Sequence, residues 1–71
     1  MATAADIERW FTYHTPKGDQ PERYRMLRDA AKTFAQVLLE LVPDCADRTA
    51  AFRKVREAVM TANAAIACEG A

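Results

Sequence analysis

Cysteine and histidine, which most often cross-link small domains or bind metals, are scarce in this sequence. It contains two cysteines, Cys45 and Cys68, and a single histidine, His14. If the segment between the cysteines is helical, a rise of about 1.5 Å per residue separates them by roughly 30 Å, far beyond the reach of a disulfide. We therefore expect reduced thiols, and we predict neither a metal site nor a cofactor.

Net charge is also lacking, because ten basic and ten acidic side chains cancel. The chain has no long-range positive field that would draw it onto DNA or RNA, which argues against a nucleic-acid polymer as partner and leaves a small anion as a candidate ligand. The sequence shows no signal peptide and no apolar run of about 20 residues. We expect a cytoplasmic protein that does not enter a membrane.

The chain is short, and its 71 residues allow one domain, spanning residues 1–71. A chain of this length buries a modest share of its surface when it folds alone. Apolar residues make up 51% of it. Without disulfides or a metal, the remaining source of stability is association with other chains, so the composition predicts an oligomer.

The N-terminal residues have the pattern of a short helix. Thr3 is placed to cap a helix over residues 3–9, and Asp6 lies three residues later, where it can bind the free N–H groups. Seven residues are marginal as an isolated helix. We therefore expect three apolar side chains to hold this segment against the rest of the protein: Ile7, Trp10 and Phe11.

The densest group of aromatic residues follows. Residues 11–13 have the β-branched and aromatic character of an extended strand, and a loop is expected from His14 because Pro16 and Gly18 cannot continue a regular element. We expect Tyr13 to be half-exposed and available for stacking, because its hydroxyl tolerates water.

Two long helices are predicted over residues 21–42 and 46–68, joined by a short connection into an antiparallel hairpin. Pro43 ends the first and Gly70 the second. Acidic and amide residues are expected to cap them: Asp19 or Gln20 the first, Asp44 with Asp47 the second. Apolar residues at steps of three and four form facing stripes: Leu27, Ala31, Phe34, Leu38 and Leu41 on the first helix; Phe52, Val55, Val59, Ala62 and Ile66 on the second.

The first long helix is apolar beyond its stripe. Five further residues lie outside the face that a partner helix can cover: Tyr24, Met26, Ala30, Val37 and Leu39. This surplus predicts an interface between chains. The charged residues of the second helix are expected to form a solvated face: Arg53, Lys54, Arg56 and Glu57. The fold class is thus all-α, a short N-terminal segment followed by a two-helix hairpin that self-associates.

No catalytic arrangement is indicated. A nucleophile paired with a base would require a cysteine close to His14, and an acid–base pair would require sheltered carboxylates. The cysteines fall at a turn and near the chain end, and the acidic residues are placed as caps or surface partners. We do not expect an enzyme.

Anion binding is better supported. Arg25, Arg28 and Lys32 are spaced by three and four residues, so their side chains emerge on one face of the first long helix and can converge on a phosphate. A base stacked on Tyr13 would complete the recognition of a ligand that is both planar and anionic. The alternative is a solvated surface on which these cations pair with acidic residues of the same helix.

Two motifs stand near the ends of the sequence. F-T-Y-H-x-P covers residues 11–16, E-A-V-M-x-A-N-A-x-I-A covers residues 57–67, and the stretch G-D-Q-P-E-R-Y covers residues 18–24. Each motif is weak alone, but the pair is specific. With the Leu- and Val-rich helix between them, they closely resemble the small phage-encoded anti-CBASS sponge proteins over nearly the whole chain.

The resemblance implies a helical hairpin that assembles into a homohexamer. It also implies a protein that binds cyclic oligonucleotide second messengers without cleaving them, in the cytoplasm of the infected bacterium. Sequestration would starve the immune effectors that these messengers activate. In this family, cyclic dinucleotides such as 3′,3′-cGAMP occupy pockets between protomers.

The resemblance also suggests roles for individual residues. Tyr13 would stack on the bases and Arg28 would contact the phosphates, with the other two cations of that helix face, Arg25 and Lys32, as reserves. Thr12 and His14 flank the ring and would supply polar contacts. A histidine that only holds the loop by hydrogen bonds is an equal alternative.

Cyclic trinucleotides form a second ligand class in the family, bound near a threefold axis with a basic residue from the end of the last helix. Cys68 and Glu69 occupy that region here, so dinucleotides are the firmer expectation. Asn63 has two interpretations: it forms an interhelical hydrogen bond at an interface, or it contacts the ligand. A different hypothesis is an oligomeric hairpin that binds a protein partner as a regulatory or structural module. It explains the apolar surface but not the aromatic residues 11–13 and the loop that follows them, which we call the aromatic loop.

Overall fold

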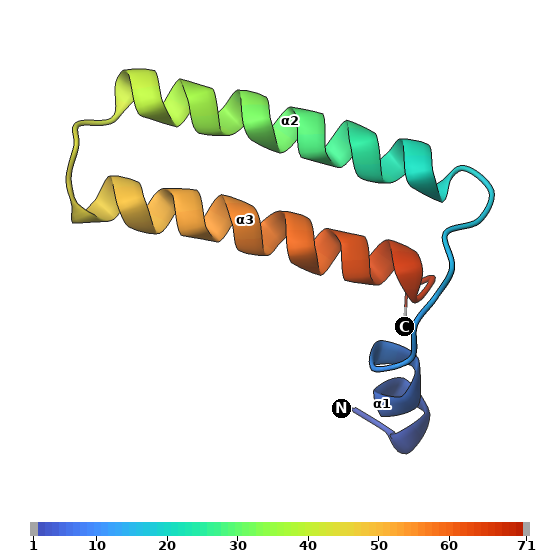
Figure 1. Ribbon diagram of the computed structural model, residues 1–71. Coiled ribbons are helices and arrows are strands. Elements are labelled where there is room, and N and C mark those ends of the chain that lie inside the picture. The colour runs from blue at the N-terminus through green and yellow to red at the C-terminus, as the bar shows by residue number, and fades with distance from the viewer. Residues whose placement is uncertain (1, 71) are drawn as a thin grey trace.

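The computed structural model describes residues 2–70, which form three α-helices and, within that range, no strand. They are α1 (Ala4–Trp10), α2 (Gln20–Leu41) and α3 (Ala46–Ala67). α2 and α3 run antiparallel as a hairpin, and α1 lies beyond the hairpin end where α2 begins and α3 finishes (Figure 1). The all-α prediction with a two-helix hairpin is confirmed.

α1 begins as the sequence predicts. The Thr3 hydroxyl accepts from the Asp6 N–H at 3.1 Å, and the Asp6 carboxylate accepts from the Thr3 N–H at 3.0 Å, which completes a capping box. The strand expected over residues 11–13 is wrong. Phe11 ends α1 with φ −107° and ψ 10°, and the Thr12 hydroxyl donates to the Glu8 carbonyl at 2.6 Å. This bond satisfies a free helix carbonyl, and no strand within residues 2–70 offers backbone partners for a ladder.

The two long helices start without the predicted side-chain caps. Asp19 is the N-cap residue of α2, but its side chain makes no capping hydrogen bond and lies 3.8 Å from Arg23 instead. Cys45 occupies that position in α3, while Asp44 pairs with Arg48 at 3.1 Å. Arginines one turn into each helix thus compete with the N–H groups for these carboxylates.

α3 ends in a left-handed turn. Glu69 has φ 53° and Gly70 has φ 84°, and the Gly70 N–H donates to the Ala65 carbonyl at 2.8 Å. This six-to-one bond, with the bond from the Glu69 N–H to the Ile66 carbonyl at 3.2 Å, is that of a Schellman motif. Its left-handed C′ position is held by Glu69 rather than by a glycine, and Gly70 follows it. The two cysteines are free thiols at opposite ends of α3, Cys45 exposed and Cys68 buried.

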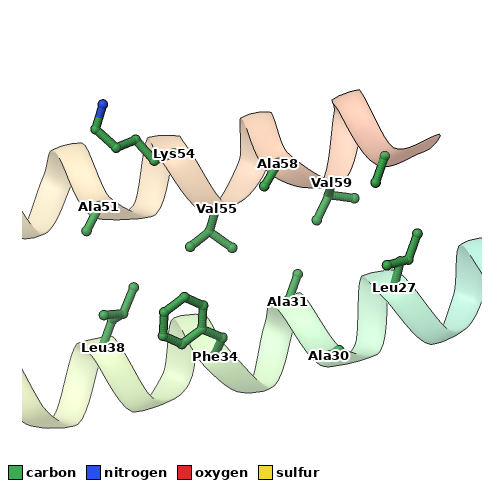
Figure 2. Close-up of a pocket in the computed structure, with 11 residues that line it drawn as sticks. Leu27, Ala30, Ala31, Phe34, Leu38, Ala51, Lys54, Val55, Ala58 and Val59 are labelled. Atoms are coloured by element: carbon green, nitrogen blue, oxygen red, sulfur yellow. The ribbon is translucent and has the colours of Figure 1, made fainter. Parts of the chain in front are cut away.

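The facing stripes of α2 and α3 meet as predicted over most of their length. Leu27, Ala31 and Leu38 are half-buried and line one groove with Val55 and Val59 of α3 (Figure 2). Two other members of the α2 stripe are less covered: Phe34, which is 54% exposed in the same groove, and Leu41, which is 76% exposed. The prediction is wrong for Leu41, because it is the last residue of α2 and the chain then turns away.

The single chain has almost no core. Among the described residues only Cys68 and Gln20 are buried, with 4% and 7% of their surface exposed. The accessible surface of 5658 Å² exceeds the roughly 4,400 Å² typical of a compact monomer of this mass. Apolar side chains of α2 remain exposed outside the stripe that faces α3, as the sequence predicts: Met26, Val37 and Leu39.

The expectation that the N-terminal apolar residues pack against the long helices is wrong for the single chain. Ile7 is 51%, Trp10 45% and Phe11 84% exposed. α1 lies beyond the end of the hairpin and not alongside α2 or α3 (Figure 1). They add to the apolar surface that another chain would have to cover.

Gln20 connects the N-terminal loop to the end of α3. Its amide nitrogen donates to the Ile66 carbonyl at 3.1 Å, and its amide oxygen accepts from the Lys17 N–H at 3.1 Å. Both partners are backbone groups, and the side chain is buried. Gln20 is therefore one of the residues that join the loop to the hairpin.

We predict that Gln20→Ala lowers the free energy of unfolding by about 1 to 3 kcal/mol, because two partly buried backbone groups lose their partners. The thermal midpoint, followed by circular dichroism at 222 nm and fixed protein concentration, should fall by at least about 4 °C. Gln36→Ala, at an exposed position of the same helix, is the control. Equal midpoints for the two variants would contradict a joining role for Gln20.

Candidate functional site

A polar cavity of about 310 Å³ lies at the end of the hairpin, between the N-terminal loop and the last turn of α3. Its wall includes six side chains from α1, the loop, α2 and the C-terminal turn: Arg9, Tyr13, His14, Lys17, Gln20 and Glu69. We call this the end cavity. Tyr13 is 82% exposed, so its ring faces are open to a planar group.

The loop that carries Tyr13 is held by hydrogen bonds to the backbone. His14 Nε2 lies 2.7 Å from the Arg9 carbonyl, and because a carbonyl can only accept, the ring donates there. The Cys68 thiol donates to the same carbonyl at 3.5 Å, and the Arg9 guanidinium donates to the Cys68 carbonyl. His14 thus holds the loop by a hydrogen bond, and because it also lines the end cavity, its contact with a ligand stays a prediction.

Thr12 is likewise engaged within the chain. Its hydroxyl donates to the Glu8 carbonyl and lies 3.2 Å from the Glu8 carboxylate. It is exposed and is absent from the lining of the end cavity. In the single chain, Thr12 therefore acts at the end of α1 rather than beside Tyr13 in the cavity.

One ion pair crosses the end cavity. Lys17 Nζ lies 2.8 Å from a carboxylate oxygen of Glu69. The hydrogen bond from Lys17 lowers the pKa of Glu69 below its usual 4.5, and the charges of Lys17, Arg9 and His14 act in the same direction. Glu69 is therefore ionised at neutral pH and offsets part of the positive charge at this end of the molecule.

A second depression, an open groove of about 450 Å³, runs between α2 and α3. Arg28 and Lys32 of α2 and Arg56 of α3 line it. All three side chains are exposed, and within residues 2–70 none forms an ion pair with a carboxylate. We call this the cationic groove. Apolar residues complete its lining, among them Phe52, Val59 and Met60.

Arg25 is not in this groove. Its guanidinium binds the Glu22 carboxylate at one side and the Asp29 carboxylate at 3.0 Å on the other. The hydrogen bond from Arg25 lowers the pKa of Glu22, and the hydrogen bond to Glu22 raises the pKa of Arg25. Of the three cations on this helix face, Arg25 is thus a surface residue paired with acidic residues of its own helix. Arg28 and Lys32 have no such partner and are available to bind an anion.

The structure divides the sequence-predicted site residues into two regions. Tyr13 and His14 line the end cavity, whereas Arg28 and Lys32 line the cationic groove. Gln20, in the wall of the end cavity, and Arg28 are eight residues apart on α2, or about 12 Å at 1.5 Å per residue. The residue predicted to stack on a base and the residues predicted to contact phosphate are therefore not brought together within one protomer.

Sequence reasoning missed two cations. Arg9 lines the end cavity and Arg56 lines the cationic groove, although the second was assigned to a solvated face. Helical spacing gave the neighbours of each residue on its own helix. Only the packing of α1 on the C-terminal turn, and of α3 on α2, shows which groove each side chain lines.

Other kinds of site find little support in the described part of the chain. Residues 2–70 contain no group of three or more His, Cys, Asp or Glu side chains arranged to hold a metal ion. No helix among them is long and apolar enough to cross a membrane.

The chain matches one protein-family model, described as Acb2/Tad1, hairpin domain, over residues 3–67. The match takes in α1, the aromatic loop and both long helices. Searches of curated proteins and of solved structures gave no significant match. Because the family model covers nearly the whole chain, this protein belongs to the Acb2/Tad1 hairpin family, the family of anti-CBASS sponge proteins.

Proposed function

We propose that this protein binds cyclic oligonucleotide second messengers and holds them intact, so that a phage evades CBASS immunity in the cytoplasm of its bacterial host. Cyclic dinucleotides such as 3′,3′-cGAMP are the principal ligands. The observation that carries the proposal is the family match over residues 3–67. An exposed tyrosine ring and two unpaired cations of α2 supply the groups that such a ligand needs.

The proposed binding unit is an assembly of several copies, a homohexamer by the family resemblance. A groove of about 710 Å³, lined almost entirely by apolar residues of α2 and α3, supports association, because water would otherwise cover it (Figure 2). The side-chain oxygen of Asn63 is buried without a hydrogen-bond partner among the described residues, so this oxygen makes no interhelical hydrogen bond within one chain.

The proposed ligand pocket lies between protomers. Tyr13 and Arg28 lie in separate regions of one chain. A dinucleotide that stacks on the ring of one protomer would reach the cations of the next, which makes the assembly a condition for binding. Cyclic trinucleotides are the weaker candidates, because Glu69 brings negative charge where the family resemblance calls for a basic residue.

Sequestration rather than cleavage fits the chemistry of the described residues. His14 Nε2 already donates to a backbone carbonyl, and Glu69 is ionised and bound to Lys17. The buried Cys68 thiol donates to the same Arg9 carbonyl as His14, so no described hydrogen bond joins this thiol to the imidazole as a nucleophile–base pair would require. A protein-binding hairpin module is the second candidate, favoured by the open apolar groove, but it gives no role to the exposed Tyr13.

Native mass spectrometry of the protein with and without 3′,3′-cGAMP tests the proposal directly. We expect an oligomer that binds a fixed number of ligands and releases them with unchanged mass after long incubation. An oligomer that binds no cyclic nucleotide would support the protein-binding module instead. A ligand of altered mass would indicate an enzyme.

Tyr13→Ala should weaken 3′,3′-cGAMP binding by at least about fivefold in isothermal titration calorimetry, because base stacking on an aromatic ring contributes about 1 to 3 kcal/mol. Tyr13→Phe keeps the ring and should stay close to wild type. The side chain is exposed, so the oligomer should be unchanged by native mass spectrometry. Wild-type affinity of Tyr13→Ala would refute the stacking role.

Arg28→Gln should also weaken binding about tenfold or more, since charge-assisted hydrogen bonds contribute about 1.5 to 3 kcal/mol. Arg25→Gln is the matched control, because Arg25 is already bound to Glu22 and Asp29 and should change the affinity little. The same titration measures both. The reverse order of effects would assign the phosphate contact to Arg25.

A further inference from the structure

The basic residues of the chain fall into two groups by their partners. Five bind a carboxylate or a backbone carbonyl: Arg9, Lys17, Arg23, Arg25 and Arg48. Within residues 2–70 the other five form no ion pair: Arg28, Lys32, Arg53, Lys54 and Arg56. Three of these five line the cationic groove. The net charge of zero therefore conceals a local excess of positive charge.

The excess comes from both walls of the groove. Arg28 and Lys32 are four residues apart on α2, and Arg56 lies on α3, which packs against α2. Phe52 and Met60 lie one turn to either side of Arg56 and line the same groove. Cations beside apolar surface are less screened than cations in bulk water, so they attract an anion more strongly.

We infer that Arg56 is a further phosphate contact, reaching the ligand from α3 while Arg28 and Lys32 reach it from α2. A ligand with two phosphodiester groups is then bound by both helices of the hairpin. The inference rests on the proposed function, because it takes a cyclic dinucleotide as the ligand. Three like charges around one groove repel each other, and a bound anion removes that repulsion. The planar guanidinium of Arg56 suits paired hydrogen bonds to phosphate oxygens.

Arg53 provides a matched control on the same helix. It is exposed, forms no ion pair within residues 2–70, and is absent from the lining of the groove. Isothermal titration with 3′,3′-cGAMP should show at least tenfold weaker binding for Arg56→Gln, and a change of less than about twofold for Arg53→Gln. Arg56→Lys keeps the charge and should recover part of the loss. Equal losses for Arg53→Gln and Arg56→Gln would overturn the inference, because they would indicate a long-range effect of net charge.

Arg28→Gln distinguishes the inference from the proposed function. If Arg28→Gln loses affinity and Arg56→Gln does not, Arg56 is no contact and the proposed function stands. If the wild-type protein binds no cyclic nucleotide, the proposed function fails, and the inference fails with it.

Chemical protection of the wild-type protein keeps the test independent of how the variants fold. Phenylglyoxal modifies accessible guanidinium groups, and peptide mass spectrometry locates the modified residues. We expect 3′,3′-cGAMP to protect Arg56 and Arg28 and to leave Arg53 reactive. An Arg56 that is unreactive in the ligand-free assembly, or equally reactive with and without ligand, would overturn the inference.

Discussion

The structure depends on one constraint: two helices cannot cover the apolar surface that this sequence carries. A helix has one face toward its partner, whereas α2 also exposes Met26, Val37 and Leu39, which lie outside the stripe that faces α3. Only Cys68 and Gln20 are buried among the described residues, and both lie at the ends of the long helices rather than along the hairpin. The hydrophobic effect therefore favours association of copies, which is also the condition for the proposed pocket between protomers.

The buried residues show where the single chain is most tightly organised. Gln20 binds the end of α3, and the carbonyl of Arg9 accepts from both His14 and Cys68. These contacts connect α1, the aromatic loop and the C-terminal turn at one end of the hairpin. These hydrogen bonds hold the backbone of the loop that carries Tyr13, while the Tyr13 ring itself is exposed. A stacking residue gains from this arrangement, because a loop that is already ordered loses less conformational entropy when a ligand binds.

Pairing decides which charges are available for a ligand. Arg25, which shares a helix face with Arg28 and Lys32 in the sequence, is neutralised by Glu22 and Asp29. Glu69 likewise neutralises Lys17 at the end cavity through an ion pair. The cations left without a carboxylate concentrate in the groove between α2 and α3. A chain with no net charge thereby presents a positive groove of the size of a small ligand, without the broad field that would attract nucleic-acid polymers.

The sequence by itself determined the helices, because helix formation depends on local signals: the Thr3–Asp6 capping box, Pro43 after α2 and the three-four spacing of Val55 and Val59. Its motifs also indicated the family, which the match over residues 3–67 confirms. The tertiary structure decided that Trp10 and Phe11 are exposed, that Phe11 to Tyr13 form no strand, and that Asp44 pairs with Arg48 instead of capping α3. It alone decided that Arg56 lines a groove with Arg28, since periodicity places residues on one helix but cannot specify which face of a second helix lies opposite.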